Sequence, residues 1–221
     1  MTNPTADISL REAAIVAGFG LLIMTIVYMF ADLFALQTLI VPVDAAETAH
    51  NILADEGLFR MAICGFIVVI ILDVVVAWAL YVLLKPVNKS LSLLMAWFRL
   101  VYATVFSFSL VFPVIVLLLL SGADYLTVFE TDQLHAQVTL FLNAFRDGWA
   151  IGLVFFGLHL ALLGYLVFKS GYIPRILGIL LIVAGLSYLI DYFGEFLFPT
   201  FNVGISQIAG WGELLFMVWL L

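Results

Sequence analysis

Charged side chains are scarce in this sequence. Asp, Glu, Lys and Arg make up 10% of its 221 residues, whereas hydrophobic residues make up 66%. A typical soluble domain carries about 25% charged residues, so the composition excludes an ordinary soluble fold and indicates a chain that is embedded in lipid. Basic residues are the scarcest, with 8 Lys and Arg against 15 Asp and Glu, and the net charge of −7 argues against nucleic acid as a partner.

The residues and motifs of several common site types are also missing. Cys64 is the only cysteine, which excludes an internal disulfide and a CxxC redox or metal motif. The sequence contains no GxSxG nucleophile motif, no Gly-rich phosphate loop and no HExxH zinc motif. His159 is the one histidine within an apolar run, so a haem held by two histidines is not expected. The sequence therefore predicts no cofactor and no metal site, and it gives no positive sign of an enzyme.

Long apolar runs dominate what is present. A membrane-spanning helix needs about 20 apolar residues, and six segments meet or approach this length, the last being the shortest. They are Ala13–Leu36, Leu58–Leu84, Leu91–Leu120, Phe145–Phe168, Ile173–Phe193 and Ser206–Leu221. The fold class predicted is all-α: a polytopic membrane helix bundle with six transmembrane helices, forming a single transmembrane domain over residues 1–221.

The positions of Lys and Arg predict the orientation of these spans. Positive residues concentrate in cytoplasmic loops, and Arg11, Lys85, Lys89, Lys169 and Arg175 all fall before the first span or in alternate loops. The remaining loops are acidic, which places them outside and both termini in the cytoplasm. The first span is expected to be a retained signal anchor, because its apolar run is longer than that of a cleaved signal peptide.

Local signals predict further details of the helices. Asp44 and Glu47 form a capping-box pattern for a short outer-face helix through Ala54, and Thr131 is a candidate N-cap for a second one. Pro113 is expected to kink the third span, because proline frees the carbonyl four residues earlier. Glycines recur every seven residues from position 157 to position 185, which predicts that the fourth and fifth spans pack closely as a hairpin.

Two ionisable residues lie deep within apolar runs. A 1.5 Å rise per residue places Asp73 and Arg99 at similar depths on the two arms of a helical hairpin. A charge in the bilayer centre costs roughly 2.5–3.5 kcal/mol on insertion scales, so the sequence predicts a buried Asp73–Arg99 ion pair. Such a pair either fixes the register of the two helices or takes part in a coupling or proton-relay function.

A second polar group lies towards the outer ends of the spans. Five carboxylates face only two guanidiniums there, and Glu213 lies deeper than the rest. The carboxylates are those of Asp32, Asp147, Asp191, Glu195 and Glu213, and the guanidiniums are those of Arg60 and Arg146. Either each of these side chains contacts lipid headgroups or water on its own, or together they line an outward-facing polar pocket. The pocket predicted comprises Arg60, Arg146, Asp191, Glu195, Glu213 and His159.

Several stretches resemble a bacterial membrane family catalogued as domain of unknown function 4386. The resemblance is carried by residues 155–178, 184–191, 198–199, 58–60 and 80–87, and it covers almost the whole chain. It supports the six-span fold and implies a bacterial cytoplasmic (inner) membrane. Arg60, His159, Arg175 and Asp191 match recurring positions of the family, although the resemblance implies no particular catalytic residues.

Three functions remain open from the sequence. The leading one is an integral membrane protein that binds a lipid or small amphiphile in the polar pocket, or that acts as an accessory subunit in a homo- or hetero-oligomer. The second is an intramembrane hydrolase that uses histidine and carboxylates. The third is a proton- or ion-coupled carrier, which would depend on Asp73 and Arg99. Membrane lipids are the partners expected in each case.

Overall fold

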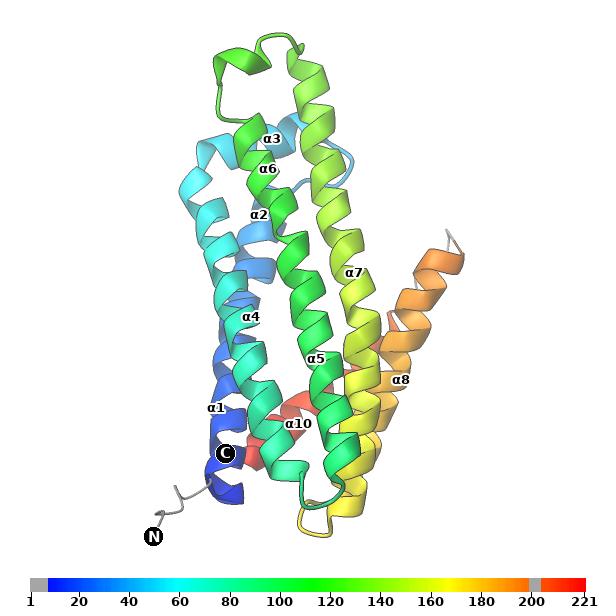
Figure 1. Cartoon of the computed structure of the whole chain (residues 1–221). Coiled ribbons are helices and arrows are strands. Elements are labelled where there is room, and N and C mark those ends of the chain that lie inside the picture. The colour runs from blue at the N-terminus through cyan, green and yellow to red at the C-terminus, as the bar shows by residue number, and fades with distance from the viewer. Residues whose placement is uncertain (1–7, 199–203) are drawn as a thin grey trace. The chain divides into compact units, whose positions relative to one another are not determined.

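Every regular element that the computed structural model describes is a helix (Figure 1). The description covers residues 8–198 and 204–221. Within these residues, five helices are long and apolar enough to cross a membrane. They are Leu10–Leu39, Glu56–Leu84, Lys89–Leu119, Thr131–Ser170 and Arg175–Leu197. The all-helical membrane bundle predicted from composition is therefore confirmed.

The last predicted span is shorter than the others. The segment predicted as the sixth span contains two short helices, α9 (Ile205–Ala209) and α10 (Trp211–Leu220), which are separated at Gly210. Neither helix alone reaches the ~20 residues that a crossing requires. Five spans are thus supported by length, and the sixth crossing stays a prediction.

The two outer-face helices differ from each other. Helix α3 (Ala45–Ala54) begins as the capping pattern predicts, since Asp44 Oδ1 accepts a hydrogen bond of 2.9 Å from the Glu47 amide. The second one is not a separate helix. Thr131 begins α7 (Thr131–Ser170), which runs without a break into the predicted fourth span. The sequence explains this continuity, because no proline and no glycine before Gly148 interrupts the helical spacing.

Two of the long helices contain interruptions. The third span divides at Leu110 into α5 (Lys89–Ser109) and α6 (Val111–Leu119), three residues before Pro113. This one-residue interruption lies where the kink was predicted. The first span changes from α1 (Leu10–Tyr28) into the π-helical segment η1 (Met29–Leu36) and then α2 (Gln37–Leu39), which the sequence did not predict.

By its internal contacts the chain divides into two compact units. Unit 1 consists of Met1–Leu22, Leu72–Tyr102 and Leu153–Leu221, so far as these are described, and unit 2 consists of Ile23–Ile71 and Ala103–Gly152. Each unit is assembled from segments that are distant in sequence. Helices α1, α4 (Glu56–Leu84), α5 and α7 contribute residues to both units.

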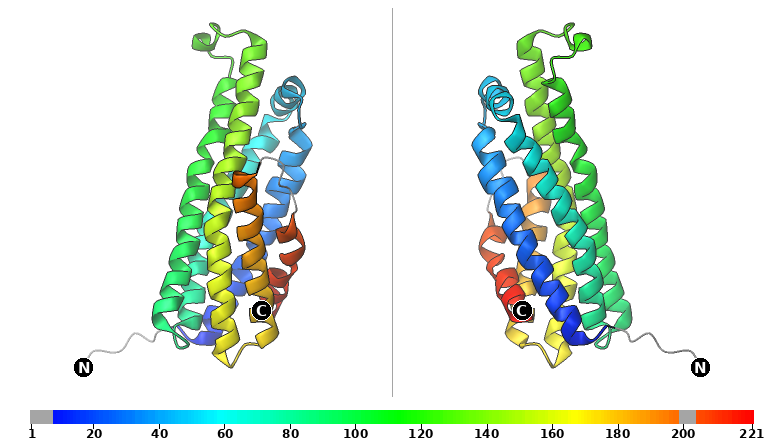
Figure 2. Two further views of the ribbon diagram at one scale, coloured as in Figure 1. Left: turned by 90° about the vertical axis from the view of Figure 1, so that its right-hand side faces the viewer. Right: turned by 90° about the vertical axis from the view of Figure 1, so that its left-hand side faces the viewer.

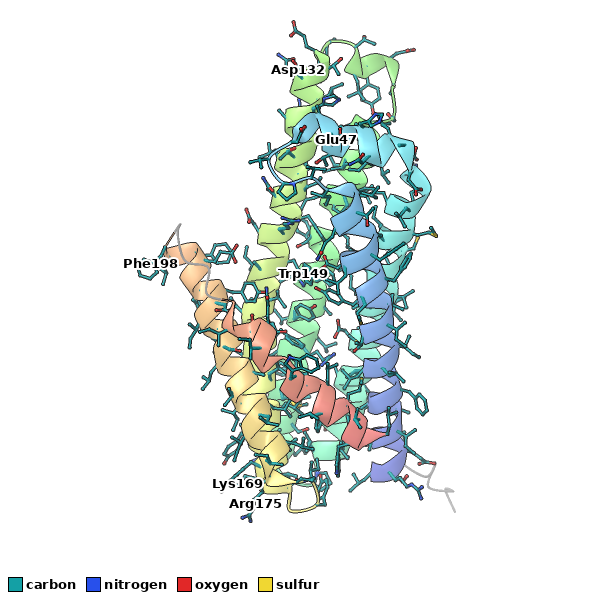
Figure 3. All side chains as sticks on the ribbon, turned by 180° about the vertical axis from the view of Figure 1, so that it is seen from behind. Glu47, Asp132, Trp149, Lys169, Arg175 and Phe198 are labelled. Atoms are coloured by element: carbon teal, nitrogen blue, oxygen red, sulfur yellow. The ribbon has the colours of Figure 1, made fainter. Side chains whose placement is uncertain are left out.

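Unit 1 contains the glycine hairpin predicted from the seven-residue repeat. The second half of α7 lies against α8 (Arg175–Leu197), with Lys169 and Arg175 on either side of the turn that joins them (Figures 2 and 3). A methyl group added to Gly164 would lie 2.6 Å from the Gly178 carbonyl oxygen, and one added to Gly157 would lie 2.9 Å from that of Gly185. The two backbones therefore approach too closely for any side chain, which confirms the prediction of a tight hairpin.

Unit 2 is held together largely by aromatic side chains. Phe66, Phe106, Phe145 and Trp149 pack against one another with ring centroids 5.0–6.2 Å apart, and Tyr28 meets Trp149 edge-on at 5.7 Å. Aromatic pairs at these separations contribute about 0.5–1.5 kcal/mol each beyond the area that they bury. Three helices of unit 2, α4, α5 and α7, supply the four central rings, so the cluster fixes their packing.

Candidate functional site

The most unusual feature of unit 1 is an ion pair enclosed by apolar side chains. Asp73 lies on the face of α4 that also carries Val76 and Leu80, and its exposed fraction is 0%. Arg99 lies on the face of α5 that carries Met95, and it is 2% exposed. The Arg99 Nη2 atom is 2.7 Å from Asp73 Oδ1. The structure therefore places together the two residues that the sequence analysis paired.

His159 of α7 extends this pair. Its Nδ1 is 2.9 Å from the Met95 carbonyl oxygen, and its Nε2 is 3.2 Å from Arg99 Nη1. A carbonyl oxygen can only accept a hydrogen bond, so Nδ1 must carry the hydrogen. The Nε2 lone pair then accepts from Arg99. His159 is accordingly a neutral imidazole, and it contacts a different nitrogen of the guanidinium from the one that the carboxylate contacts.

An aromatic ring lies against the guanidinium. The Arg99 Cζ atom lies 5.5 Å from the centre of the Phe156 ring, within the range of a cation–π interaction. Phe156 in turn stacks on His159 at 5.7 Å and meets Tyr188 edge-on at 5.5 Å. Since Phe156 and His159 are three residues apart on α7, one helix face presents both groups to Arg99.

Two further carboxylates of unit 1 have buried oxygen atoms. Glu213, in the first turn of α10, receives a hydrogen bond from the Tyr188 side chain and lies close enough to Arg99 for electrostatic attraction. Asp191 of α8 is 9% exposed, and its Oδ2 accepts a 2.7 Å hydrogen bond from the Ser206 amide. Asp191 therefore attaches α9 to α8.

Each carboxylate of unit 1 named above keeps one buried oxygen without a hydrogen-bond partner among the described residues. These atoms are Asp73 Oδ2, Asp191 Oδ1 and Glu213 Oε1. A buried charge is costly unless it is paired and hydrogen-bonded, and here Asp73 and Glu213 share the single guanidinium of Arg99, beside a neutral imidazole. We call Asp73, Arg99, His159, Asp191 and Glu213 the polar network. Its carboxylates outnumber its one positive charge, and the three oxygens lack a hydrogen-bond donor.

The six residues of the predicted pocket are divided between the two units. His159, Asp191, Glu195 and Glu213 belong to unit 1, whereas Arg60 and Arg146 belong to unit 2. Asp191 and Glu195 are both part of the predicted pocket, and they are one turn apart on α8. The structure separates their environments: Asp191 is buried and bonded to Ser206, and Glu195 is exposed.

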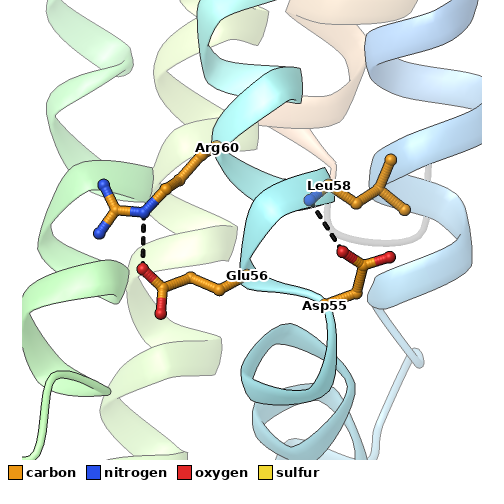
Figure 4. Close-up of polar contacts among 4 residues, drawn as sticks. All are labelled: Asp55, Glu56, Leu58 and Arg60. Carbon is orange, nitrogen blue, oxygen red and sulfur yellow. Dashed lines mark hydrogen bonds and ion pairs between the residues drawn. The ribbon is translucent and has the colours of Figure 1, made fainter.

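The basic pocket residues have local partners within unit 2. Arg60 Nε is 2.6 Å from Glu56 Oε1 on the same exposed face of α4 (Figure 4). The neighbouring Asp55 accepts a 3.0 Å hydrogen bond from the Leu58 amide and so caps the helix. Arg146 is exposed and lies near the half-buried Asp32, whose Oδ2 accepts from the Tyr28 hydroxyl at 3.2 Å.

The surroundings of the histidines give little support to a hydrolase that uses histidine and carboxylates. Both ring nitrogens of His159 face protein partners, so neither is directed at a water molecule or a metal ion. His50 and His135 belong to unit 2, where His50 is exposed. Over the ranges that the structure describes, no three His, Cys, Asp or Glu side chains converge as metal ligands.

Sequence reasoning missed three parts of the network. Tyr188 precedes Asp191 by three residues, which is the spacing of one helix face and could have indicated a shared site. Phe156 has the same relation to His159. The Met95 carbonyl carries no side-chain signal at all, because a backbone group accepts the hydrogen bond.

Comparison with known proteins agrees with the motifs in the sequence. The model of the family described as "Domain of unknown function (DUF4386)" matches residues 16–221. The chain belongs to this family. An uncharacterised protein of Archaeoglobus fulgidus is 40% identical to the chain over 159 residues, which are 72% of this chain and 81% of that protein. No solved structure matches the chain. Proteins similar to this DUF4386 member thus occur in archaea, and no described activity accompanies either comparison.

Proposed function

We propose that this DUF4386 protein is an integral membrane protein that binds a lipid or a small amphiphile at the polar network of unit 1. The observation that carries the proposal is the set of unpartnered oxygens of Asp73, Asp191 and Glu213. A hydrophobic chain gives a ligand access from the bilayer, and a polar headgroup supplies the missing interactions of the network.

Glu213 is the point of approach. The residue as a whole is half-buried, although its Oε1 atom is enclosed. It also lies in the first turn of α10, directly after the interruption of the helix at Gly210. Asp73, by contrast, is held by Arg99 and has no exposed surface. We therefore assign ligand contact to Glu213 and Asp191, and orientation of the network to Asp73, Arg99 and His159.

The test compares purified protein in detergent with and without the polar lipids extracted from its host membrane. We expect the lipids to raise the melting temperature of the wild type, and to raise that of Glu213→Gln by much less. Glu195→Gln is the matched control, because Glu195 is an exposed carboxylate of the same unit. Equal lipid stabilisation of all three proteins would refute binding at the network.

We also propose the finer topology predicted from the sequence, with both termini in the cytoplasm of a bacterial inner membrane and a sixth crossing at the C-terminus. The basic residues Lys169 and Arg175 at the α7–α8 turn support this orientation (Figure 3). Single cysteines introduced at Lys169 and at Asp132, on a Cys64→Ala background, test it. A membrane-impermeant maleimide applied to intact cells should label the Asp132 site and leave the Lys169 site unlabelled, and the reverse pattern would overturn the orientation.

A further inference from the structure

The chemistry of the unpartnered atoms in unit 1 restricts what the ligand can be. Asp73 Oδ2, Asp191 Oδ1 and Glu213 Oε1 are all carboxylate oxygens, which accept hydrogen bonds when ionised and cannot donate them. A ligand that brought another acceptor, such as a phosphate or a carboxylate, would leave these atoms unsatisfied. It would also add negative charge to a site where two carboxylates, those of Asp73 and Glu213, already share one guanidinium.

The positive group of the network is already engaged. Arg99 directs Nη2 at Asp73 and Nη1 at His159, and its Cζ lies over the Phe156 ring. An anionic headgroup would have to displace Asp73 in order to reach the guanidinium, and the displaced carboxylate would then be buried without its counter-charge. Breaking a buried pair in this way is strongly unfavourable. Arg99 therefore neutralises the network and does not serve as an anion site.

We propose that the headgroup bound by Asp191 and Glu213 is a protonated primary or secondary amine. This inference rests on the proposed function, and it names the class of ligand for the same site. An ammonium group carries the missing positive charge and also N–H donors for the two carboxylate oxygens. Charge-assisted hydrogen bonds of this kind are roughly twice as strong as neutral ones, so both properties of the headgroup contribute.

Four probes with the same 12-carbon chain separate these properties. Dodecylamine has the charge and the N–H donors, and dodecyltrimethylammonium has the charge without donors. Dodecanol has a donor without charge, and dodecanoate has the opposite charge. Each is titrated below its micellar concentration at pH 7 into the full-length protein in lipid nanodiscs, with tryptophan-detected melting temperature as the readout. An alkylamine is protonated at this pH, because its pKa is close to that of lysine, about 10.4.

We expect saturable stabilisation by dodecylamine, with an affinity about tenfold or more above that for dodecyltrimethylammonium, since the N–H donors contribute in addition to the charge. Dodecanol and dodecanoate should produce no saturable shift. Glu213→Gln and Asp191→Asn should each weaken dodecylamine binding by about tenfold, and Glu195→Gln should leave it unchanged. If either network variant does not fold, the ranking of the four probes on the wild type still decides the question.

The possible failures are distinct. Equal affinity for dodecylamine and dodecyltrimethylammonium would overturn the requirement for donors and therefore the inference. Tighter, Glu213-dependent binding of dodecanoate would also overturn it, while the proposed lipid-binding function would stand. The absence of a saturable effect from all four probes and from the host lipids would overturn both.

Discussion

A methyl group at Gly178 should separate the two helices of the α7–α8 hairpin. In Gly178→Ala the new Cβ would lie 2.6 Å from the Phe168 amide nitrogen and 2.7 Å from the Gly164 carbonyl oxygen. Both are backbone atoms, so no side-chain rotation relieves the contact. Ordinary contact begins at 3.4 Å, and the helices must therefore move apart by the difference from 2.6 Å, about 0.8 Å.

The expected cost follows from this displacement. A gap of 0.5–1 Å forfeits roughly a quarter to a half of the dispersion energy of each contact across the interface, and overpacking of a well-packed core costs about 1–3 kcal/mol. The greater helix propensity of alanine returns about 0.5–1 kcal/mol. We therefore expect Gly178→Ala to lower the free energy of unfolding by roughly 0.5–2 kcal/mol.

The assay is reversible unfolding in mixed micelles by SDS, followed by tryptophan fluorescence. Gly57→Ala is the matched control, because a methyl group at Gly57 meets only Asp55 Oδ1, at 3.7 Å. This control should be neutral or slightly stabilising. A Gly164→Ala, Gly178→Ala double variant should cost less than the sum of the single variants, because one separation of the helices relieves both contacts. If Gly178→Ala is as stable as the wild type while the control behaves as stated, the close approach of these helices is wrong.

Three further predictions concern single interactions. Asp73→Asn should destabilise the protein by about 3–5 kcal/mol in the same assay, because it removes the charged partner that the buried Arg99 guanidinium contacts directly. Restoration of stability by an apolar pair, Asp73→Leu with Arg99→Met, would support this cause, and an equal loss in that pair would contradict it. Tyr172→Phe should cost about 0.5–1.5 kcal/mol by removing the 2.6 Å hydrogen bond to the Leu83 carbonyl. Burial raises the pKa of Tyr172 above its ordinary value near 10. The stabilisation that its neutral hydroxyl provides is therefore complete below about pH 10 and is lost as the pH rises through the folded-state pKa. If the melting temperatures of the wild type and Tyr172→Phe depend equally on pH between about pH 9 and pH 11, this reasoning is wrong. Asp44→Ala should lose about 1 kcal/mol of local helix stability, seen as faster amide hydrogen exchange confined to α3, and unchanged exchange there would show that the cap does not contribute.

The helices themselves were largely predictable, because their cause is local. Apolar length identifies a crossing, and the five long spans have this length. The cap at Asp44, the break before Pro113 and the glycine hairpin also follow from residues close in the sequence. The π-helical segment at Met29–Leu36 was not predicted, since its composition is that of an ordinary apolar helix.

The site was predictable only in part. Depth within a span suggested the pairing of Asp73 with Arg99, because a charge in lipid needs a partner that lies at the same level. Depth does not specify rotation about the helix axis, however, and so it did not show that His159 accepts from Arg99. The same ambiguity grouped Asp191 with Glu195, although only Asp191 is buried.

The sequence by itself determined that this DUF4386 member is an all-helical membrane protein with charges buried in its spans, because composition and apolar length act residue by residue. The tertiary structure decided which of those charges meet. The tautomer of His159, the position of Tyr188 beside Glu213 and the bond from Ser206 to Asp191 all depend on contacts between helices. Such contacts are set by how each helix is rotated against its neighbours, and a single sequence carries no local signal for that rotation.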